Sequence, residues 1–286
     1  MKATNESIHL ETAVSTGSTA MPVVVGEFAV PTATNDNIKI HNCSCADMSV
    51  ILDGSVHLTV TSPPYNVGIS YGQNSNDNLP LAEYRAFAKK VFGEVFRVTA
   101  DHGRVAINIG NSHSKPYVHL ASIYADLMAE IGFDMKGEII WNKVGAKTLN
   151  TAWGSWLSPS APTLREHHEH VLIFSKGDWS RPELRGNRRM TKEEFKAATL
   201  SIWDIPAQRR TRKVASHPAP FPVELPRRLI KLLTGANDLI LDPFTGTGTT
   251  ALAAYELGNH FVGFELEPHW VQFAWQRLRD AGYGAA

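Results

Sequence analysis

The 286-residue sequence lacks several features that would restrict its class at once. It has only two cysteines, Cys43 and Cys45, which are too few and too close together for a disulfide framework, so a reducing, cytoplasmic setting is expected. No apolar run approaches the roughly 18 residues that a membrane span needs, and the N-terminus lacks the basic-then-apolar pattern of a secretory signal. We therefore expect a soluble protein without a membrane partner.

A net charge is also missing, because 28 basic residues balance 28 acidic ones. The charges are unevenly spread, however, since residues 181–213 contain ten lysines and arginines against four acids. Such a local excess can form a basic face on a neutral protein, which favours contact with nucleic acid. With 43% hydrophobic and 20% charged residues, the composition is typical of a globular chain with one large domain or one domain carrying an insertion.

Regular patterns begin after residues 1–35, a Ser-, Thr- and Ala-rich segment that we interpret as a flexible tail. Residues 36–286 are expected to fold as one domain. Residues 142–168 and 177–216 lack a clear period, and we interpret them as inserted recognition segments rather than core. Elsewhere strands alternate with helices, which indicates an α/β fold with a largely parallel sheet between two helical layers. The folded part is expected to start at a short apolar run, 37–41. Strands are predicted at 56–61, 104–109, 136–141, 169–175, 239–241 and 260–265, and helices at 81–99, 118–131, 222–233, 249–257 and 267–280.

Residues 242–248, which we call the glycine turn, join an apolar strand to the start of a helix. Gly246 and Gly248 let the backbone approach a ligand, and a helix N-terminus offers free amides. The next strand ends in Glu265, which can accept hydrogen bonds from ribose hydroxyls. A P-loop lysine and the third glycine of a dinucleotide fingerprint are both absent. A nucleoside cofactor without a phosphate chain remains, most commonly S-adenosylmethionine, with a plain strand-to-helix turn as the alternative.

Residues 61–66 (TSPPYN), which we call the proline element, follow a predicted strand and are stiffened by two prolines. An exocyclic amino group is a poor nucleophile because its lone pair is delocalised into the ring. Acceptors that hold both its hydrogens out of the ring plane would free that lone pair. Ser62 Oγ and the carbonyl of Pro63 or Pro64 can be those acceptors, while Tyr65 offers a face for a base swung out of a duplex. A proline turn that merely ends an edge strand is the alternative interpretation.

With both elements present in this order, the sequence resembles the amino-group DNA methyltransferases of the β arrangement, in which the catalytic element precedes the cofactor turn. The resemblance covers residues 37–280 and implies a Rossmann-like, circularly permuted S-adenosylmethionine-dependent methyltransferase fold with an inserted target-recognition region. It is carried by TSPPYN, DPFTGTGTT, HPAPFPVELPRRLI and GFELEP. Ser62, where the family more often has Asp, resembles the cytosine-N4 subgroup. Some adenine-N6 enzymes also depart from Asp, so adenine N6 stays the alternative target.

The resemblance also implies which residues do what. The catalytic residues would be Ser62, Pro63, Pro64 and Tyr65. The cofactor would be bound by Asp47, Thr61, Phe221, Asp242, Pro243, Phe244, Gly246, Gly248, Thr249 and Glu265. DNA would be contacted by Trp153, Arg165, Arg209, Arg210, Arg212 and Lys213. The expected partner is double-stranded DNA with a target base flipped out, and pairing of two copies into a homodimer stays open.

Two other interpretations can be weighed from the residues. His167, His168 and His170 lack the helical His-Glu-x-x-His spacing, so we expect no metal. An enzyme of the same chemistry that acts on RNA, and a non-catalytic nucleic-acid-binding module with a degenerate cofactor fold, remain rival functions.

Overall fold

The computed structural model describes residues 37–111, 117–143, 153–208 and 221–284. Its centre is an eight-stranded sheet in the order β1-β8-β7-β2-β3-β5-β4-β6. The strands are β1 (Ile38–His41), β2 (Val56–Thr61), β3 (Thr99–Ile109), β4 (Asp134–Asn142), β5 (His168–Ser175), β6 (Ile202–Asp204), β7 (Leu239–Asp242) and β8 (His260–Phe264). Every pairing is parallel except those of β5, which runs antiparallel to both β3 and β4. The predicted α/β class with a largely parallel sheet is confirmed.

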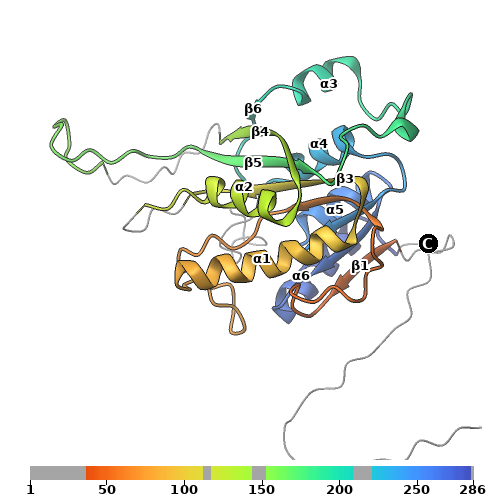
Figure 1. Ribbon diagram of the computed structural model, residues 1–286, viewed down its shortest axis with the longest axis horizontal. Helices are drawn as coiled ribbons and strands as arrows, with labels where there is room; N and C mark the ends of the chain where they lie inside the picture. The colour runs from red at the N-terminus through yellow and green to blue at the C-terminus, as the bar shows by residue number, and fades with distance from the viewer. Residues whose placement is uncertain (1–36, 112–116, 144–152, 209–220, 285–286) are drawn as a thin grey trace, which may run out of the picture.

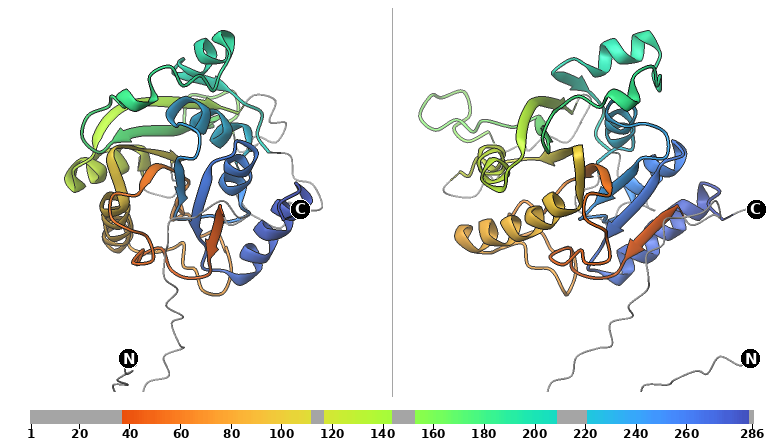
Figure 2. Two further views of the ribbon diagram at one scale, coloured as in Figure 1. Left: turned by 90° about the vertical axis from the view of Figure 1, so that its right-hand side faces the viewer. Right: turned by 45° about the vertical axis from the view of Figure 1, so that its right-hand side comes forward.

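Helices cover both faces of the sheet (Figures 1 and 2). Side chains of α1 and α2 fill one core layer, while α4, α5 and the end of α6 contribute to the other. Gly132 ends α2 in the left-handed conformation (φ 115°), as its place after the apolar pattern predicts. The helices are α1 (Leu81–Val98), α2 (Leu120–Ile131), α3 (Lys192–Ala198), α4 (Glu224–Leu233), α5 (Thr249–Glu256) and α6 (Pro268–Asp280), with a short 3₁₀ turn, η1, at Pro182–Leu184.

The described part of residues 177–216, which was predicted to be irregular, contains regular structure. It forms helix α3, begun by a reciprocal Thr191–Glu194 capping box, and strand β6, which pairs with β4 at the edge of the sheet. Trp203 of β6 is only 1% exposed and packs in the core. The prediction failed because both elements are too short to establish a period.

Candidate active site

The proline element and the glycine turn leave the sheet side by side. Strands β2 and β7 are parallel neighbours, with Thr59 opposite Leu241. The two segments that follow these strands therefore lie at the same edge of the sheet, where open parallel sheets bind ligands. This brings together the two elements that sequence patterns predict to act jointly.

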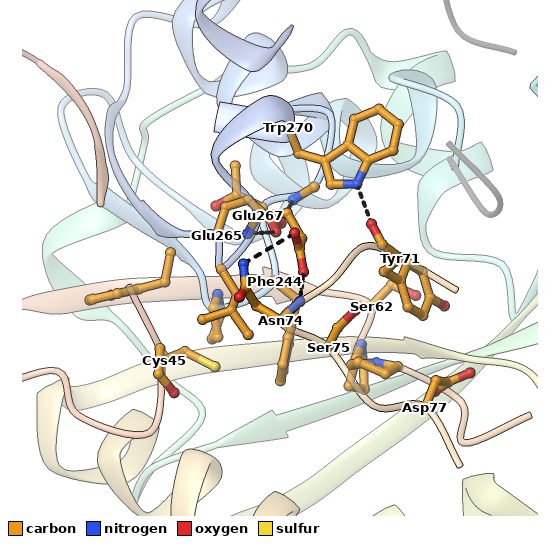
Figure 3. A pocket seen from close by; sticks show the side chains of 18 of the residues that line it. Cys45, Ser62, Tyr71, Asn74, Ser75, Asp77, Phe244, Glu265, Glu267 and Trp270 are labelled. Atoms are coloured by element: carbon orange, nitrogen blue, oxygen red, sulfur yellow. Dashed lines mark hydrogen bonds between the residues drawn. The ribbon is translucent and has the colours of Figure 1, made fainter. Parts of the chain in front are cut away.

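A cavity of about 320 Å³ lies at this edge (Figure 3), a volume in the range of small-molecule sites. Its walls come from the turn after β1, the proline element, the loop before α1, the glycine turn and the start of α6. The predicted site residues that line it are Ser62, Pro63, Pro64, Tyr65, Phe221, Pro243, Phe244, Gly246, Thr249 and Glu265.

Glu265 links the glycine turn to the next strand. Its Oε2 accepts a hydrogen bond from the Gly246 amide at 2.8 Å, and its Oε1 accepts one from the Glu267 amide at 2.9 Å. Burial raises the pKa of Glu265, although the two amides partly offset this effect. Gly246 has a φ of 49°, in the left-handed region that favours glycine. The carboxylate is thus held on the cavity wall at the end of β8.

Asp242 supports the glycine turn from beneath. Its carboxylate is buried and accepts hydrogen bonds from the hydroxyls of Thr61 and Thr250, both at 2.7 Å, and from the Phe244 amide at 3.1 Å. Burial raises the pKa of Asp242 to about 6. Neither Asp242 nor Thr61 lines the cavity, although both were predicted to bind cofactor. The Thr61 hydroxyl donates to the Asp242 carboxylate. Both residues therefore stabilise the shape of the glycine turn.

Gly248 serves helix packing rather than the cavity. It lies outside the cavity lining, with a φ of 74°, and a Cβ there would lie 2.7 Å from the Cβ of Ala274 in α6. The lack of a side chain at Gly248 thus allows α5 to approach α6 closely.

Asp47, predicted to bind adenine, is exposed and outside the cavity lining. Its carboxylate accepts a hydrogen bond from the Ser49 amide at 2.9 Å, so it caps its own turn. The residues of this turn that line the cavity are Cys43, Ser44 and Cys45. Burial raises the pKa of the Cys45 thiol to about 12, which keeps that side chain neutral. Cys43, in contrast, is exposed.

The proline element is anchored through its second proline. The Tyr84 hydroxyl of α1 donates to the Pro64 carbonyl at 2.6 Å, and Tyr84 and Tyr124 share a second hydrogen bond of 2.9 Å. Of the two carbonyls that could hold a substrate amine, the Pro64 carbonyl is therefore engaged within the protein. This leaves the Pro63 carbonyl as the candidate.

Ser62 belongs to a polar network that reaches across the sheet. Its hydroxyl lies 3.1 Å from the Tyr65 hydroxyl, which donates to Glu169 Oε2 at 3.1 Å. The Asn108 amide donates to the same carboxylate oxygen at 2.6 Å, and Lys143 pairs with the other oxygen. Sequence patterns miss Glu169 because it lies between two histidines at the start of the apolar strand β5, with no motif of its own.

A loop formed by residues 66–79 covers one side of the cavity. The Asp77 carboxylate accepts hydrogen bonds from the amides of Asn66, Val67 and Ile69, at 2.7 to 3.1 Å. Farther along, the Asn74 amide donates to Glu267 at 2.7 Å (Figure 3). The Trp270 indole of α6 also donates to the Tyr71 carbonyl at 3.0 Å. Sequence analysis assigned nothing to this loop, because its contacts are distant in sequence.

Comparison with known proteins identifies the family of this chain. Residues 56–276 match the DNA methylase family of N6 and N4 methyltransferases. The chain belongs to this family. It is 32% identical over 266 residues to the type II methyltransferase M.MjaI of Methanocaldococcus jannaschii, covering 81% of this chain and 88% of that one. It is therefore an S-adenosylmethionine-dependent DNA methyltransferase.

Two solved structures have a similar fold. The putative DNA modification methylase TTHA0409 of Thermus thermophilus, in complex with S-adenosyl-L-methionine, has a TM-score of 0.66 and 30% identity, covering 85% of this chain and 96% of that one. The PvuII DNA methyltransferase, described as cytosine-N4-specific, has a TM-score of 0.67 and 20% identity, covering 86% and 89%. The predicted permuted methyltransferase fold is thereby confirmed, and at 20% identity the second likeness concerns the fold alone.

The cavity of this methyltransferase fits its cofactor, S-adenosyl-L-methionine. Phe221, Pro243 and Phe244 offer apolar walls for a purine, and Glu265 offers a carboxylate for ribose hydroxyls. The Ser75 hydroxyl lines the cavity and is buried without a hydrogen-bond partner among the described residues. A bound polar ligand would satisfy that group.

The residues predicted to contact DNA are placed in part. Trp153 and Arg165 lie on a hairpin segment with a bridge between Gly154 and Pro162, and this segment projects from the domain ahead of the start of β5 (Figure 1). The Arg165 guanidinium stacks 3.4 Å from the centre of the Trp153 ring. The other predicted contacts lie outside the described residues; they are Arg209, Arg210, Arg212 and Lys213.

Part of the basic run 181–213 is structural. Arg181 makes two hydrogen bonds to the buried carboxylate of Asp238, at 2.6 and 3.2 Å. Arg189 donates to the Thr234 hydroxyl and to the Gly235 and Leu257 carbonyls. These two arginines hold the segment onto the domain, so the basic face available to DNA is smaller than the residue count predicts.

The histidines near β5 have local partners. His170 Nδ1 lies 2.5 Å from Glu138, and the Asn111 amide lies 3.2 Å from its Nε2. Across the part of the chain that the structure describes, no group of three or more His, Cys, Asp and Glu side chains is arranged to hold a metal ion. None of the helices described is long and apolar enough to cross a membrane.

Proposed function

We propose that this methyltransferase transfers the methyl group to N4 of cytosine at a specific site in double-stranded DNA, with the target base rotated out of the duplex. One observation carries the proposal: Ser62 and Pro63 line the same cavity as Gly246 and Glu265. Acceptors for an amine and the residues suited to the cofactor thus border one space. The serine at position 62, rather than aspartate, supports cytosine as the target.

The residues of the proline element would act only on the exocyclic amino group of the target base. Ser62 Oγ and the Pro63 carbonyl each accept one hydrogen bond from the amino group, which turns its lone pair out of the ring plane. The nitrogen then attacks the methyl carbon, the carbon–sulfur bond breaks, and the nitrogen loses one proton to solvent. Rigidity supports this step, because Tyr84 holds the Pro64 carbonyl and the acceptors need no rearrangement.

Five residues on the cavity wall would hold the cofactor. S-adenosyl-L-methionine supplies an electrophilic methyl group when bound. Phe221 and Phe244 would contact its apolar parts, Glu265 its ribose, and Gly246 and Thr249 would border it at the start of α5. These assignments follow the positions of the side chains on the wall.

Recognition of the target would depend on segments outside the catalytic edge. We assign the hairpin that carries Trp153 and Arg165 to DNA contact, because it projects from the domain and stacks a cationic side chain on an exposed aromatic ring. The basic residues Arg209, Arg210, Arg212 and Lys213 are proposed to contact phosphates.

Digestion of methylated DNA to nucleosides, followed by mass spectrometry, identifies the product. We expect the deoxynucleoside of N4-methylcytosine. N6-methyladenine as the only product would contradict the choice of base, and transfer to structured RNA in preference to duplex DNA would contradict the choice of substrate.

The role of Ser62 has its own test. Ser62→Ala should slow methyl transfer about a hundredfold while it leaves cofactor affinity within about twofold, because Ser62 acts on the amine in the transition state. Single-turnover kinetics and isothermal calorimetry measure the two quantities. An equal loss of rate and affinity would place Ser62 in cofactor binding instead.

A further inference from the structure

The Tyr65 hydroxyl lies between Ser62 and a carboxylate that no motif identifies. It is 3.1 Å from Ser62 Oγ and 3.1 Å from Glu169 Oε2. The Asn108 side-chain amide also donates to the Tyr65 oxygen, at 3.3 Å. Three groups therefore surround one hydroxyl directly behind the residue that is proposed to hold the substrate amine.

The protons of this network follow from the chemistry of the groups. A carboxylate has no proton to give, so Glu169 accepts from Tyr65. That donation uses the only proton that Tyr65 has, and its oxygen can only accept from other neighbours. The hydrogen bond between Ser62 and Tyr65 therefore runs from Ser62 to Tyr65. Ser62 Oγ then has only lone pairs left for a further partner.

This direction matters because a serine hydroxyl donates as readily as it accepts. A serine that turned its proton toward the substrate amine would compete for the lone pair that must attack the methyl carbon. Resting on the proposed function, we propose that Tyr65 and Glu169 are positioning residues that fix Ser62 Oγ as an acceptor for the amine hydrogen. The Ser62 hydroxyl then only accepts a hydrogen bond from the amine, as an ionised carboxylate at this position would do without such neighbours.

The network is built to stay in place. The Glu169 side chain is 14% exposed, and Lys143 pairs with its Oε1 while Asn108 and Tyr65 donate to its Oε2. The Tyr65 ring packs directly on the backbone at Gly110, where a Cβ would lie 2.9 Å from Tyr65 Cε2. Because the Glu169 carboxylate can only accept, the proton of Tyr65 points to it, and this fixes the direction of the chain of hydrogen bonds.

Single-turnover methyl transfer, with the enzyme in excess over the sites of unmethylated phage DNA and with saturating labelled cofactor, tests the proposal. Tyr65→Phe keeps the aromatic face and removes the hydroxyl, and Glu169→Ala removes the acceptor. Each should slow transfer by about tenfold, the effect of one lost directed hydrogen bond. The double variant should be no slower than Tyr65→Phe, because Glu169 acts on Ser62 only through the Tyr65 hydroxyl. The cofactor dissociation constant should stay unchanged in all three.

Two further variants distinguish a lost orientation of the Ser62 hydroxyl from a general disruption of the fold. Glu169→Gln keeps an acceptor oxygen toward Tyr65 and should stay within about threefold of the wild-type rate. Tyr117→Phe is a matched control, because Tyr117 also donates to a glutamate, Glu166, at 2.6 Å, outside this network. It should transfer at the wild-type rate, and thermal melting checks that every variant is folded.

The outcomes are distinct. Losses that multiply in the double variant, or a wild-type rate in Tyr65→Phe, would overturn the positioning role. If Glu169→Ala does not fold, the comparison of Tyr65→Phe with Tyr117→Phe decides. A wild-type chain that binds cofactor and methylates no DNA would contradict the proposed function itself, and this is seen before any variant is compared.

Discussion

At the scale of single residues, two acids at the ends of adjacent strands, one buried and one partly buried, serve the cavity differently. Asp242 uses both carboxylate oxygens on hydroxyls and an amide of the protein. Glu265 borders the cavity and holds two backbone amides. The two motifs that contain these acids predict that they lie near each other but not this division, because burial and partners are set by the fold.

Substitution of Glu265 should weaken the cofactor complex. Glu265→Ala removes the carboxylate from the wall and frees the Gly246 and Glu267 amides, so we expect at least about tenfold weaker cofactor binding. Isothermal calorimetry measures it. Glu130→Ala, at an exposed pair on the helical surface, is the control and should bind normally. Unchanged affinity in Glu265→Ala would exclude the ribose role.

The pH dependence of stability should report Asp242. Its pKa is about 6 in the folded chain, above the ordinary value near 4, because burial disfavours the charged form. A carboxyl whose pKa is raised by folding favours the folded state while protonated. Its contribution, about 3 kcal/mol, is therefore fully present below about pH 4 and is lost as the pH rises through 6.

Asp242→Asn removes this titration, and the Thr61 and Thr250 hydroxyls can rotate to suit the amide. Between pH 4 and 6, the wild-type chain should lose stability relative to the variant. Urea unfolding at several pH values measures the difference. Parallel pH profiles would show that Asp242 titrates normally.

At the scale of elements, local patterns predicted most helices and strands, and nonlocal contacts decided the rest. The glycine turn was predictable because strand, turn and helix are contiguous. The strand at Trp203 was not, because three residues carry no period and β6 is stabilised by pairing with β4. The role of Glu169 was also hidden, since it depends on β5 running antiparallel beside β3.

The close contact of α5 with α6 predicts a difference in stability between two glycine variants. Gly248→Ala puts a Cβ 2.7 Å from the Ala274 Cβ, whereas Gly258→Ala meets nothing within 4 Å, and both positions have a positive φ near 70°. The first should cost about 1 to 3 kcal/mol more than the second, because only the first also crowds two helices. Thermal or urea unfolding measures both. Equal losses would mean that φ alone accounts for the cost.

At the scale of the molecule, neutrality hides an uneven distribution of charge. Arg181 and Arg189 are committed to the domain, so DNA binding depends on other basic residues. Replacing Arg209 and Arg210 by Ala should weaken DNA binding, and the logarithmic salt dependence should become shallower by about two units. Fluorescence anisotropy at several salt concentrations measures this. The double Ala variant of Lys89 and Lys90 on α1 should leave the slope unchanged, and an unchanged slope for the arginine pair would clear it of phosphate contact.

The antiparallel course of β5 has a consequence for how the site tolerates change. Glu169 lies opposite Trp141 of β4, and His170 lies opposite Ile109 of β3. The register of β5 is therefore fixed by strand pairing on both sides. Successive side chains of a strand point to opposite faces, and a slip of one residue would exchange the carboxylate for an imidazole. Insertions or deletions in the hairpin before β5, the segment that we propose to contact DNA, should therefore be tolerated only where they leave this register unchanged.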